Sequence, residues 1–287
     1  MQEYYNIPIV PRQLRLELTN RCNAHCLTCH GYGINPMKRK KGDMERSLIE
    51  KCINDVIDFP NPLQECVLNN YGEMFAYPDW FKVMQFVSAK LPQTMIVLPT
   101  NGTYLNNDTV AKLATIKTLK IINVSVNAFS PELYHMFHDI DPKVLPMIAN
   151  SLILLRKVRP DITIWVSMAH DPSYQSPKEV ELFTEYWGQF GIVQINAAQY
   201  NNRPDRAPPI PVRFPCRSIF SDMVIFWDGK CSSCCFDADA NKELYVGDAS
   251  DESLISIWHG EKFNKIRSLH LESRRHEIEI CRNCTFA

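Results

Sequence analysis

Residues 14–30 read LRLELTNRCNAHCLTCH, and this stretch decides the fold. Leucine alternates with polar residues up to Leu18, which is typical of a strand with one buried face. The loop that follows carries the spacing CxxxCxxC, with thiols at Cys22, Cys26 and Cys29. Because soft sulfur ligands suit iron, three such thiolates can hold a cuboidal 4Fe–4S cluster and leave one iron open to a small molecule.

Zinc is the alternative for these three cysteines. Zinc sites usually pair one CxxC with a second CxxC or with two histidines at a set spacing. His25 and His30 lie within or beside the motif and could complete such a site, and the thiols could also form a reduced structural group. The strand before the motif and the motifs after it favour the iron–sulfur interpretation.

Length and composition indicate one large domain, or one domain with a smaller module. The chain has 287 residues, of which 45% are hydrophobic, so a sizeable core is available. A net charge of −1 argues against a nucleic-acid or membrane-surface protein. Residues 1–13 lack a signal-peptide core and no later run is long enough to span a membrane, so we expect a cytoplasmic protein. Eleven cysteines in such a chain favour metal or redox chemistry over disulfides.

Strand and helix patterns alternate through the first two-thirds of the chain. After the first strand, we expect strands at 65–69, 94–98, 120–126, 162–168 and 192–197. We expect helices from Ser47 to 57 with Glu50 forming a capping box, at 78–91, at 108–116, within 131–159, and from the Ser176–Pro177 cap to 190. Six strand–helix units predict a parallel sheet with right-handed crossovers. The expected fold is therefore α/β, an open partial (β/α)6 parallel barrel.

Polar residues gather directly after the predicted strands. They are Tyr71-Gly72-Glu73 after the second, Asn101 after the third, Ser125 and Asn127 at the fourth, His170 after the fifth, and Asn196, Tyr200 and Arg203 at or after the sixth. The carboxyl ends of parallel strands meet at one edge, where α/β proteins bind ligands, so we expect these residues to share one mouth. Each could also be plain turn chemistry, because Asn, Gly and Ser are common in turns.

The CxxxCxxC loop after a first barrel strand resembles that of the radical S-adenosylmethionine (SAM) enzymes. In that family the open iron binds the amino and carboxylate groups of SAM. Reductive cleavage of SAM then gives a 5′-deoxyadenosyl radical, which takes a hydrogen atom from the substrate. The resemblance implies a six-stranded partial barrel and a one-electron reductant such as flavodoxin or ferredoxin. One departure is Thr28, where the family often has an aromatic residue.

The Tyr71-Gly72-Glu73 turn is similar to the GGE motif of this family, with Tyr71 in place of the first glycine. The resemblance implies that Gly72 lets the backbone approach SAM and that Glu73 binds its amino group. It implies further SAM contacts at Asn101, Ser125 and Asn127. The candidate substrate residues at the same mouth are Tyr71, His170, Asn196, Tyr200 and Arg203.

A second cysteine pattern follows a stretch that holds five prolines between residues 203 and 215. We place the domain boundary there, with a barrel at 1–203, a connector at 204–215 and a module at 216–287. The module reads C-x12-G-x4-C, a long gap and CxxC, which selects Cys216, Cys234, Cys281 and Cys284, with Cys235 as the alternative to Cys234. A hairpin around Gly229 would bring Cys216 and Cys234 together. Four cysteines would close a site with no open iron, and zinc held by four thiolates is the alternative.

This module resembles the SPASM/Twitch extension of radical SAM enzymes, including the stretch IWHGEKFNKIR at 257–267. The resemblance implies a small α+β module with one auxiliary 4Fe–4S cluster. The cysteine layout is similar to that of the 2-deoxy-scyllo-inosamine dehydrogenases, which oxidise an alcohol. We therefore expect an oxidising radical SAM enzyme that uses SAM and two 4Fe–4S clusters. A small-molecule substrate is expected, because only 13 residues precede the first strand.

Other functions stay open. A peptide or protein could still be the substrate. A nucleotide or sugar phosphate could bind the basic run Lys38–Lys41, which we otherwise expect to be a solvated loop. A free cysteine, Cys231 or Cys235, could return a hydrogen atom in a redox-neutral epimerisation. A non-enzymatic iron–sulfur or zinc-binding protein would have no use for an open iron or for Glu73.

Overall fold

The computed structural model describes residues 6–33, 36–198, 214–240, 243–282 and 284. Its strands form a nine-stranded sheet with the order β6-β5-β4-β3-β2-β1-β7-β8-β9. The first six are β1 (Gln13–Leu16), β2 (Glu65–Val67), β3 (Met95–Thr100), β4 (Leu119–Ser125), β5 (Thr163–His170) and β6 (Ile192–Ala197). Every neighbouring pair from β1 to β6 is parallel, so the predicted α/β fold with a parallel barrel sheet is confirmed.

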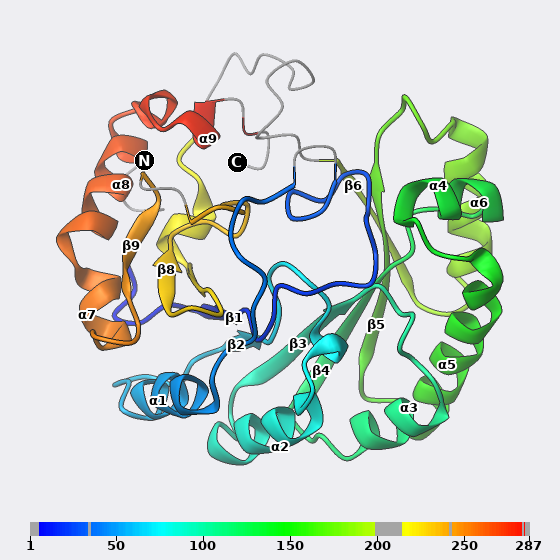
Figure 1. The fold of residues 1–287 in the computed structure, drawn as a ribbon, viewed down its shortest axis with the longest axis horizontal. Helices are drawn as coiled ribbons and strands as arrows, with labels where there is room; N and C mark the ends of the chain where they lie inside the picture. Colours follow the sequence, from blue (N-terminus) through cyan, green and yellow to red (C-terminus); the bar gives the residue numbers. More distant parts are fainter. Residues whose placement is uncertain (1–5, 34–35, 199–213, 241–242, 283, 285–287) are drawn as a thin grey trace.

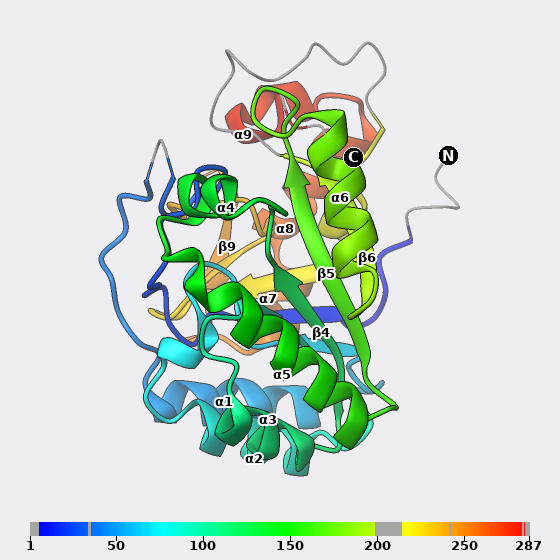
Figure 2. The ribbon, with the colours of Figure 1, turned by 90° about the vertical axis from the view of Figure 1, so that its right-hand side faces the viewer.

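Helices connect these strands and cover one side of the sheet. They are α1 (Arg46–Ile57), α2 (Trp80–Lys90), α3 (Asn107–Ala114), α4 (Pro131–His138), α5 (Leu145–Val158) and α6 (Pro177–Trp187). Figure 1 shows the sheet as an open curve with these helices outside it, and Figure 2 shows α5 and α6 along the outer face of β4 to β6. The loop after β1 crosses the inner side of the curve (Figure 1). Within the described part of the chain, no helix has the length and apolar character that crossing a membrane requires.

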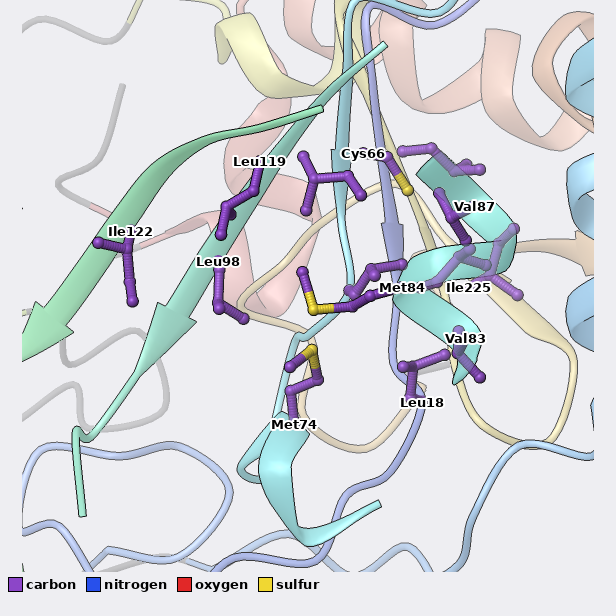
Figure 3. Close-up of a cluster of buried hydrophobic side chains, with 14 of the residues drawn as sticks. Leu18, Cys66, Met74, Val83, Met84, Val87, Leu98, Leu119, Ile122 and Ile225 are labelled. Atoms are coloured by element: carbon purple, nitrogen blue, oxygen red, sulfur yellow. The ribbon is translucent and has the colours of Figure 1, made fainter. Parts of the chain in front are cut away.

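Alternation along the strands separates two faces of the sheet. On the helix side the side chains of Cys66, Leu98 and Ile122 are fully buried, and Figure 3 shows them on three neighbouring strands within one cluster of apolar side chains that includes Met84 of α2. The alternate residues, such as Asn123 in β4, are less buried and face the interior of the barrel. The polar side chains of the strands are therefore collected in that interior.

The C-terminal cysteines belong to a segment that extends the same sheet. β7 (Asp222–Ile225) pairs in parallel with β1, and β8 (Lys230–Ser232) and β9 (Tyr245–Asp248) continue antiparallel. The predicted hairpin is confirmed, with Gly229 at a φ of +90° that glycine adopts readily. Three helices follow: α7 (Leu254–His259), α8 (Glu261–Leu271) and α9 (Glu279–Arg282). Most of the predicted connector at 204–215 lies outside the described residues.

Two local predictions are wrong. Helix α1 begins at Arg46 and has no capping box, because the Glu50 carboxylate binds Arg46 Nε at 2.7 Å instead of reaching back. Strand β1 ends at Leu16 rather than Leu18. The Leu18 amide turns back to the Leu16 carbonyl at 3.0 Å, and the Glu17 side chain is fully buried.

Candidate active site

Three predicted ligands, Cys22, Cys26 and Cys29, lie in the loop that crosses the inner side of the barrel (Figure 1). Backbone amides donate to two of the sulfurs, Ala24 N to Cys22 at 3.4 Å and Gly31 N to Cys29 at 3.3 Å. Burial raises the pKa of the Cys22 thiol to about 12, and repulsion by Glu73 and Cys29 adds to it. Such thiols give up their protons on binding a metal. The donor set fits an iron–sulfur cluster, because it consists of neighbouring soft sulfurs supported by N–H donors.

Two residues that sequence reasoning missed hold this loop in place. His138, fully buried in α4, places Nδ1 3.1 Å from Cys26 Sγ, while its Nε2 donates to a backbone carbonyl at 2.8 Å. The Tyr32 hydroxyl donates to the Asn20 carbonyl at 2.6 Å and accepts from the Cys22 amide at 2.9 Å. Neither residue carries a sequence signal, because these contacts join distant segments or close an irregular loop.

Gly72 lies against the same loop, just beyond β2. Its φ is +90°, and a Cβ added there would lie 2.6 Å from the Thr19 carbonyl oxygen and 2.7 Å from that of Arg21. The next amide, Glu73 N, donates to the Arg21 carbonyl at 2.8 Å. The turn is thus docked on the cluster loop through a close backbone approach that requires glycine.

Gly72→Ala is expected to displace the cluster loop and to weaken SAM binding by about tenfold or more. The added methyl group would meet two backbone carbonyls, which cannot swing aside as a flexible side chain can. Equilibrium binding of SAM to the anaerobically reconstituted protein would measure the effect. Gly260→Ala is the control, because Gly260 has a φ of −64° and its added Cβ would meet no atom closer than 3.1 Å. Equal SAM affinity in the two variants would contradict the prediction.

Glu73 is a buried carboxylate that has no cation beside it among the described residues. It is 2% exposed, and its oxygens accept from Asn101 N at 2.7 Å and from Thr100 Oγ1 at 2.9 Å. Burial raises the pKa of Glu73 to about 7, and these hydrogen bonds only partly offset that rise. Within the described residues, no positively charged group lowers its pKa. The ammonium of a bound amino acid would supply one.

The pKa of Glu73 predicts the pH dependence of SAM binding. Below about pH 7 the carboxyl group is protonated and no longer offers a charged acceptor to the SAM amino group, so affinity is expected to fall by about tenfold for each pH unit. Above about pH 7 the carboxylate is ionised and affinity levels off. Equilibrium binding between about pH 5.5 and pH 8 would measure this. Glu73→Gln should bind SAM weakly with a flat profile, and a flat profile for the wild type would refute the assignment.

The other predicted SAM contacts have different surroundings. Asn101 is 8% exposed, with Nδ2 3.8 Å from Cys22 Sγ. Ser125 is half-buried at the end of β4, on the interior face. Asn127 serves the fold: it has a φ of 61°, and its Oδ1 accepts from Ala169 N at 2.7 Å. The Asn101 amide is also engaged, because its Oδ1 accepts from Thr103 N at 3.0 Å and its Nδ2 donates to Asn23 Oδ1 at 2.9 Å. Of these three residues, Ser125 keeps the most freedom to contact a ligand, since its one side-chain contact is Ser167 Oγ at 3.4 Å.

Three of the five predicted substrate residues belong to the part of the chain that the structure describes, and they lie apart. Tyr71 is the one of these three that lies beside the cysteine sites. His170 ends β5, with Nε2 3.3 Å from a backbone carbonyl oxygen, and Asn196 is exposed in β6. Tyr200 and Arg203 lie outside the described residues.

The C-terminal cysteines line a common cavity. Its lining includes Cys216, Cys234, Cys235, Cys281, Cys284, His270 and Arg275. Arg275 is 1% exposed; its terminal nitrogens donate to two backbone carbonyls at 3.0 Å, while its Nε has no partner among the described residues. A buried cation facing neutral thiols is unfavourable unless an anionic group joins it. The cavity therefore fits a cluster held by thiolates.

The electrostatic neighbours of the two adjacent cysteines favour Cys234 as the fourth ligand. Burial is the main cause of the raised pKa of the Cys234 thiol, and the next causes are the neighbouring thiols of Cys235, Cys281 and Cys216. The groups whose charges act on the pKa of the Cys235 thiol are instead Arg15 and Asp222, and Cys216 is the one cysteine among them. Cys234 thus faces thiols of both other ligand segments.

Cys234→Ala is expected to lose the auxiliary cluster, or about four iron atoms per chain, whereas Cys235→Ala keeps it. The two variants remove the same atom from neighbouring positions, so each serves as the control for the other. Iron and sulfide analysis after anaerobic reconstitution would measure the difference. Iron loss in Cys235→Ala alone would reverse the assignment.

Tyr71 lies next to both cysteine sites. It is 7% exposed, and its ring packs on Gly31, where an added Cβ would lie 2.9 Å from Tyr71 Cδ1. Burial raises the pKa of Tyr71 well above its usual value, and the next influences are Cys235, Cys29 and Cys234. One side chain thus neighbours the first cluster loop and the auxiliary cavity, so the two sites adjoin one part of the interior.

Cys231 does not suit the role of a hydrogen-atom donor. Its side chain is fully buried, and its Sγ lies 3.5 Å from the Gly229 carbonyl oxygen. Burial is the main cause of the raised pKa of its thiol, and the next is Cys52, on the buried face of α1. Cys231 is therefore a core residue.

The basic run Lys38–Lys41 was predicted to be a solvated loop, and this is wrong for Arg39. The side chain of Arg39 is also not free to bind a phosphate group. Arg39 binds both oxygens of Glu17, at 2.8 and 2.9 Å, and its side chain is 7% exposed. Its guanidinium also lies 4.1 Å from the centre of the Phe226 ring. Lys38 and Lys40 are exposed, as expected of a solvated loop. The available signal was Glu17, a charged residue between leucines of a strand.

Two family models match the chain. The radical SAM superfamily matches residues 16–169, more than half of the chain, and an iron-sulfur cluster-binding domain (SPASM) matches residues 216–285. These matches cover the loop with the first three cysteines and the cavity with the other ligands.

Similarity to individual proteins is lower. The chain is 24% identical over 128 residues to the antilisterial bacteriocin subtilosin biosynthesis protein AlbA of Bacillus subtilis (strain 168), covering 45% of this chain and 27% of that protein. It is 32% identical over 50 residues to the S-adenosyl-L-methionine-dependent 2-deoxy-scyllo-inosamine dehydrogenase of Niallia circulans, covering 17% and 20%. The chain thus matches about a quarter of the length of these relatives. The crystal structure of BtrN in complex with AdoMet and 2-DOIA has a TM-score of 0.68 at 17% identity, covering 96% of this chain and 93% of that chain, which shows a common fold.

Proposed function

The chain belongs to the radical SAM superfamily, and from this premise we propose that it oxidises an alcohol group of a small molecule. When bound, SAM and the two clusters supply a radical that removes hydrogen from carbon and an acceptor for the electron that the substrate then loses. The alcohol carbon loses one hydrogen atom, one electron and the hydroxyl proton, and it becomes a carbonyl carbon. A one-electron reductant must supply the electron that cleaves SAM.

Each group of residues has a separate role in this proposal, which follows from its position. Cys22, Cys26 and Cys29 would hold the cluster that binds SAM, and the buried Glu73 carboxylate would accept a hydrogen bond from the SAM amino group. Cys216, Cys234, Cys281 and Cys284 would enclose the auxiliary cluster, with the buried Arg275 cation compensating its charge. Enclosure by four thiolates leaves that cluster no open iron, which suits electron transfer better than ligand binding.

The position of Tyr71 carries this proposal. Its ring packs on Gly31, two residues after Cys29, and the charges that act on its hydroxyl include those of Cys29 of the first site and Cys234 of the second. A substrate radical formed beside the first site would therefore lie close to an electron acceptor, which supports oxidation over a redox-neutral outcome. Similarity to a 2-deoxy-scyllo-inosamine dehydrogenase supports a small alcohol, whereas similarity to a bacteriocin biosynthesis protein supports a peptide as the second candidate.

Anaerobic turnover with a chemical reductant tests the proposal. The wild type should form 5′-deoxyadenosine, and with 2-deoxy-scyllo-inosamine as the probe it should form one ketone per 5′-deoxyadenosine. Cys281→Ala should still cleave SAM but should form no ketone, because the electron acceptor is missing. Absence of 5′-deoxyadenosine from the wild type would overturn the proposal. Deuterium from solvent bound to carbon in the product would show that the reaction is an epimerisation and not an oxidation.

A further inference from the structure

Buried polar atoms without partners gather on the interior face of the barrel. Among the described residues, Arg15 Nε, Asn69 Oδ1, Tyr71 Oη and Asn123 Oδ1 are buried and have no hydrogen-bond partner. Most buried polar atoms in proteins are paired, and each that is not costs roughly 1–3 kcal/mol. We call these four side chains the interior strip.

Strand pairing places the members of the interior strip next to one another. Arg15 in β1 is paired with Val67 in β2, two residues before Asn69. Asn69 Nδ2 donates to the Pro99 carbonyl at 3.4 Å, and Pro99 in β3 is paired with Asn123 in β4. Asn69 lies two residues beyond the end of β2, and its contact with Pro99 of β3 places it between Arg15 on β1 and Asn123 on β4. The strip therefore runs from β1 to β4 inside the barrel.

Tyr71 continues the interior strip to the space beside the cysteines. It is 7% exposed, so its unpartnered hydroxyl is enclosed by protein. A phenol O–H without a partner can donate a hydrogen bond to a ligand. Because Cys29 and Cys234 are its neighbours, a molecule bound to the strip would lie where hydrogen abstraction and electron transfer are both expected.

We propose that the interior strip is the substrate subsite and that it selects a small, polyhydroxylated or aminated molecule. The two asparagine oxygens accept, so they require O–H or N–H groups on the ligand. The tyrosine hydroxyl and the arginine Nε–H donate, so they require ligand oxygens. This inference rests on the proposed function and goes beyond it by naming the substrate class and four recognition residues.

The charge of the interior strip disfavours a phosphate group. Arg15 is its one cation, and the Asp222 carboxyl lies close enough for Arg15 to lower its pKa against the effect of burial. Since an acidic neighbour offsets this guanidinium, a doubly charged phosphate would find little net attraction. A neutral or singly charged polar ligand fits better.

Binding to the reconstituted enzyme with SAM tests the inference, with 2-deoxy-scyllo-inosamine and cyclohexylamine as the two probes. Both probes carry an amine on a six-membered ring, and cyclohexylamine lacks the hydroxyl groups. The wild type is expected to bind the hydroxylated probe about 100-fold more tightly, because several hydrogen bonds are lost with the other. Equal affinity for the two probes would overturn the inference.

Two variants assign the effect to the interior strip. Tyr71→Phe and Asn123→Leu keep the shape of the side chain and remove its polar group, and each is expected to weaken binding of the hydroxylated probe about tenfold. Tyr134→Phe is the control, because Tyr134 is fully buried in α4 with a hydroxyl that also lacks a partner among the described residues.

The outcomes separate the two proposals. If the wild type does not cleave SAM, the proposed function fails. If SAM cleavage is normal but Tyr71→Phe and Asn123→Leu bind the hydroxylated probe as well as Tyr134→Phe does, the substrate subsite is wrong and the proposed function stands.

Discussion

Cys26→Ala is expected to abolish cleavage of SAM, a loss of about a thousandfold or more, while the auxiliary cysteines keep their cluster. Two remaining cysteines cannot hold three irons of a cubane and still leave the fourth open. The thiol of Cys26 is also in contact with His138, at 3.1 Å, so the variant removes that contact, while the backbone hydrogen bonds of His25 and Leu27 to α4 remain. Iron content should fall from about eight to about four atoms per chain.

Cys52→Ala is the matched control for this loss. Cys52 is fully buried on α1 and belongs to the apolar core, so its replacement should lower the free energy of unfolding by about 1–2 kcal/mol and leave both clusters in place. Anaerobic iron analysis and 5′-deoxyadenosine formation would compare the two variants. Cleavage of SAM by Cys26→Ala would show that this cysteine is not a ligand of the cluster that binds SAM.

Periodicity predicted most of the sheet, because each strand carries its own pattern. Strand β6 has the predicted bounds, Ile192–Ala197, and helix α6 begins at the predicted Ser176–Pro177 cap, where Ser176 Oγ accepts from Glu179 N at 3.2 Å. The ends of β1 and α1 were misplaced because side chains decided them. Glu17 turned inward to Arg39, and an ion pair replaced the capping box.

The candidate site divides in the same way. Spacing and strand context selected the cysteines, and resemblance to the GGE motif selected Gly72 and Glu73, because these signals are local. The roles of Tyr71 and His138 depend on contacts between segments far apart in sequence, such as the 112 residues between Cys26 and His138. A single sequence carries no measure of such contacts, so they required the structure.

Arg39→Met is expected to lower the free energy of unfolding by about 3–5 kcal/mol, because it leaves a buried carboxylate without its cation. Glu17 is fully buried and receives both terminal nitrogens of Arg39. It also accepts from the Tyr71 and Trp227 amides at 3.3 Å, so the pair joins the barrel, the Tyr71-Gly72-Glu73 turn and the C-terminal hairpin. Loss of the pair should therefore loosen both cysteine sites.

The pH dependence of this loss gives a second measurement. Burial raises the pKa of Glu17 even with Arg39 beside it, and removing the cation raises that pKa further. A carboxyl whose folded-state pKa is raised loses stability as pH rises through that value, so Arg39→Met should be less destabilised at about pH 6 than at about pH 8. Lys40→Met, with an exposed side chain in the same basic run, should change stability by less than about 0.5 kcal/mol. Urea unfolding under anaerobic conditions would measure the free energy of unfolding of both variants. If Arg39→Met and Lys40→Met are equally stable at both pH values, the Arg39 charge does not support the fold.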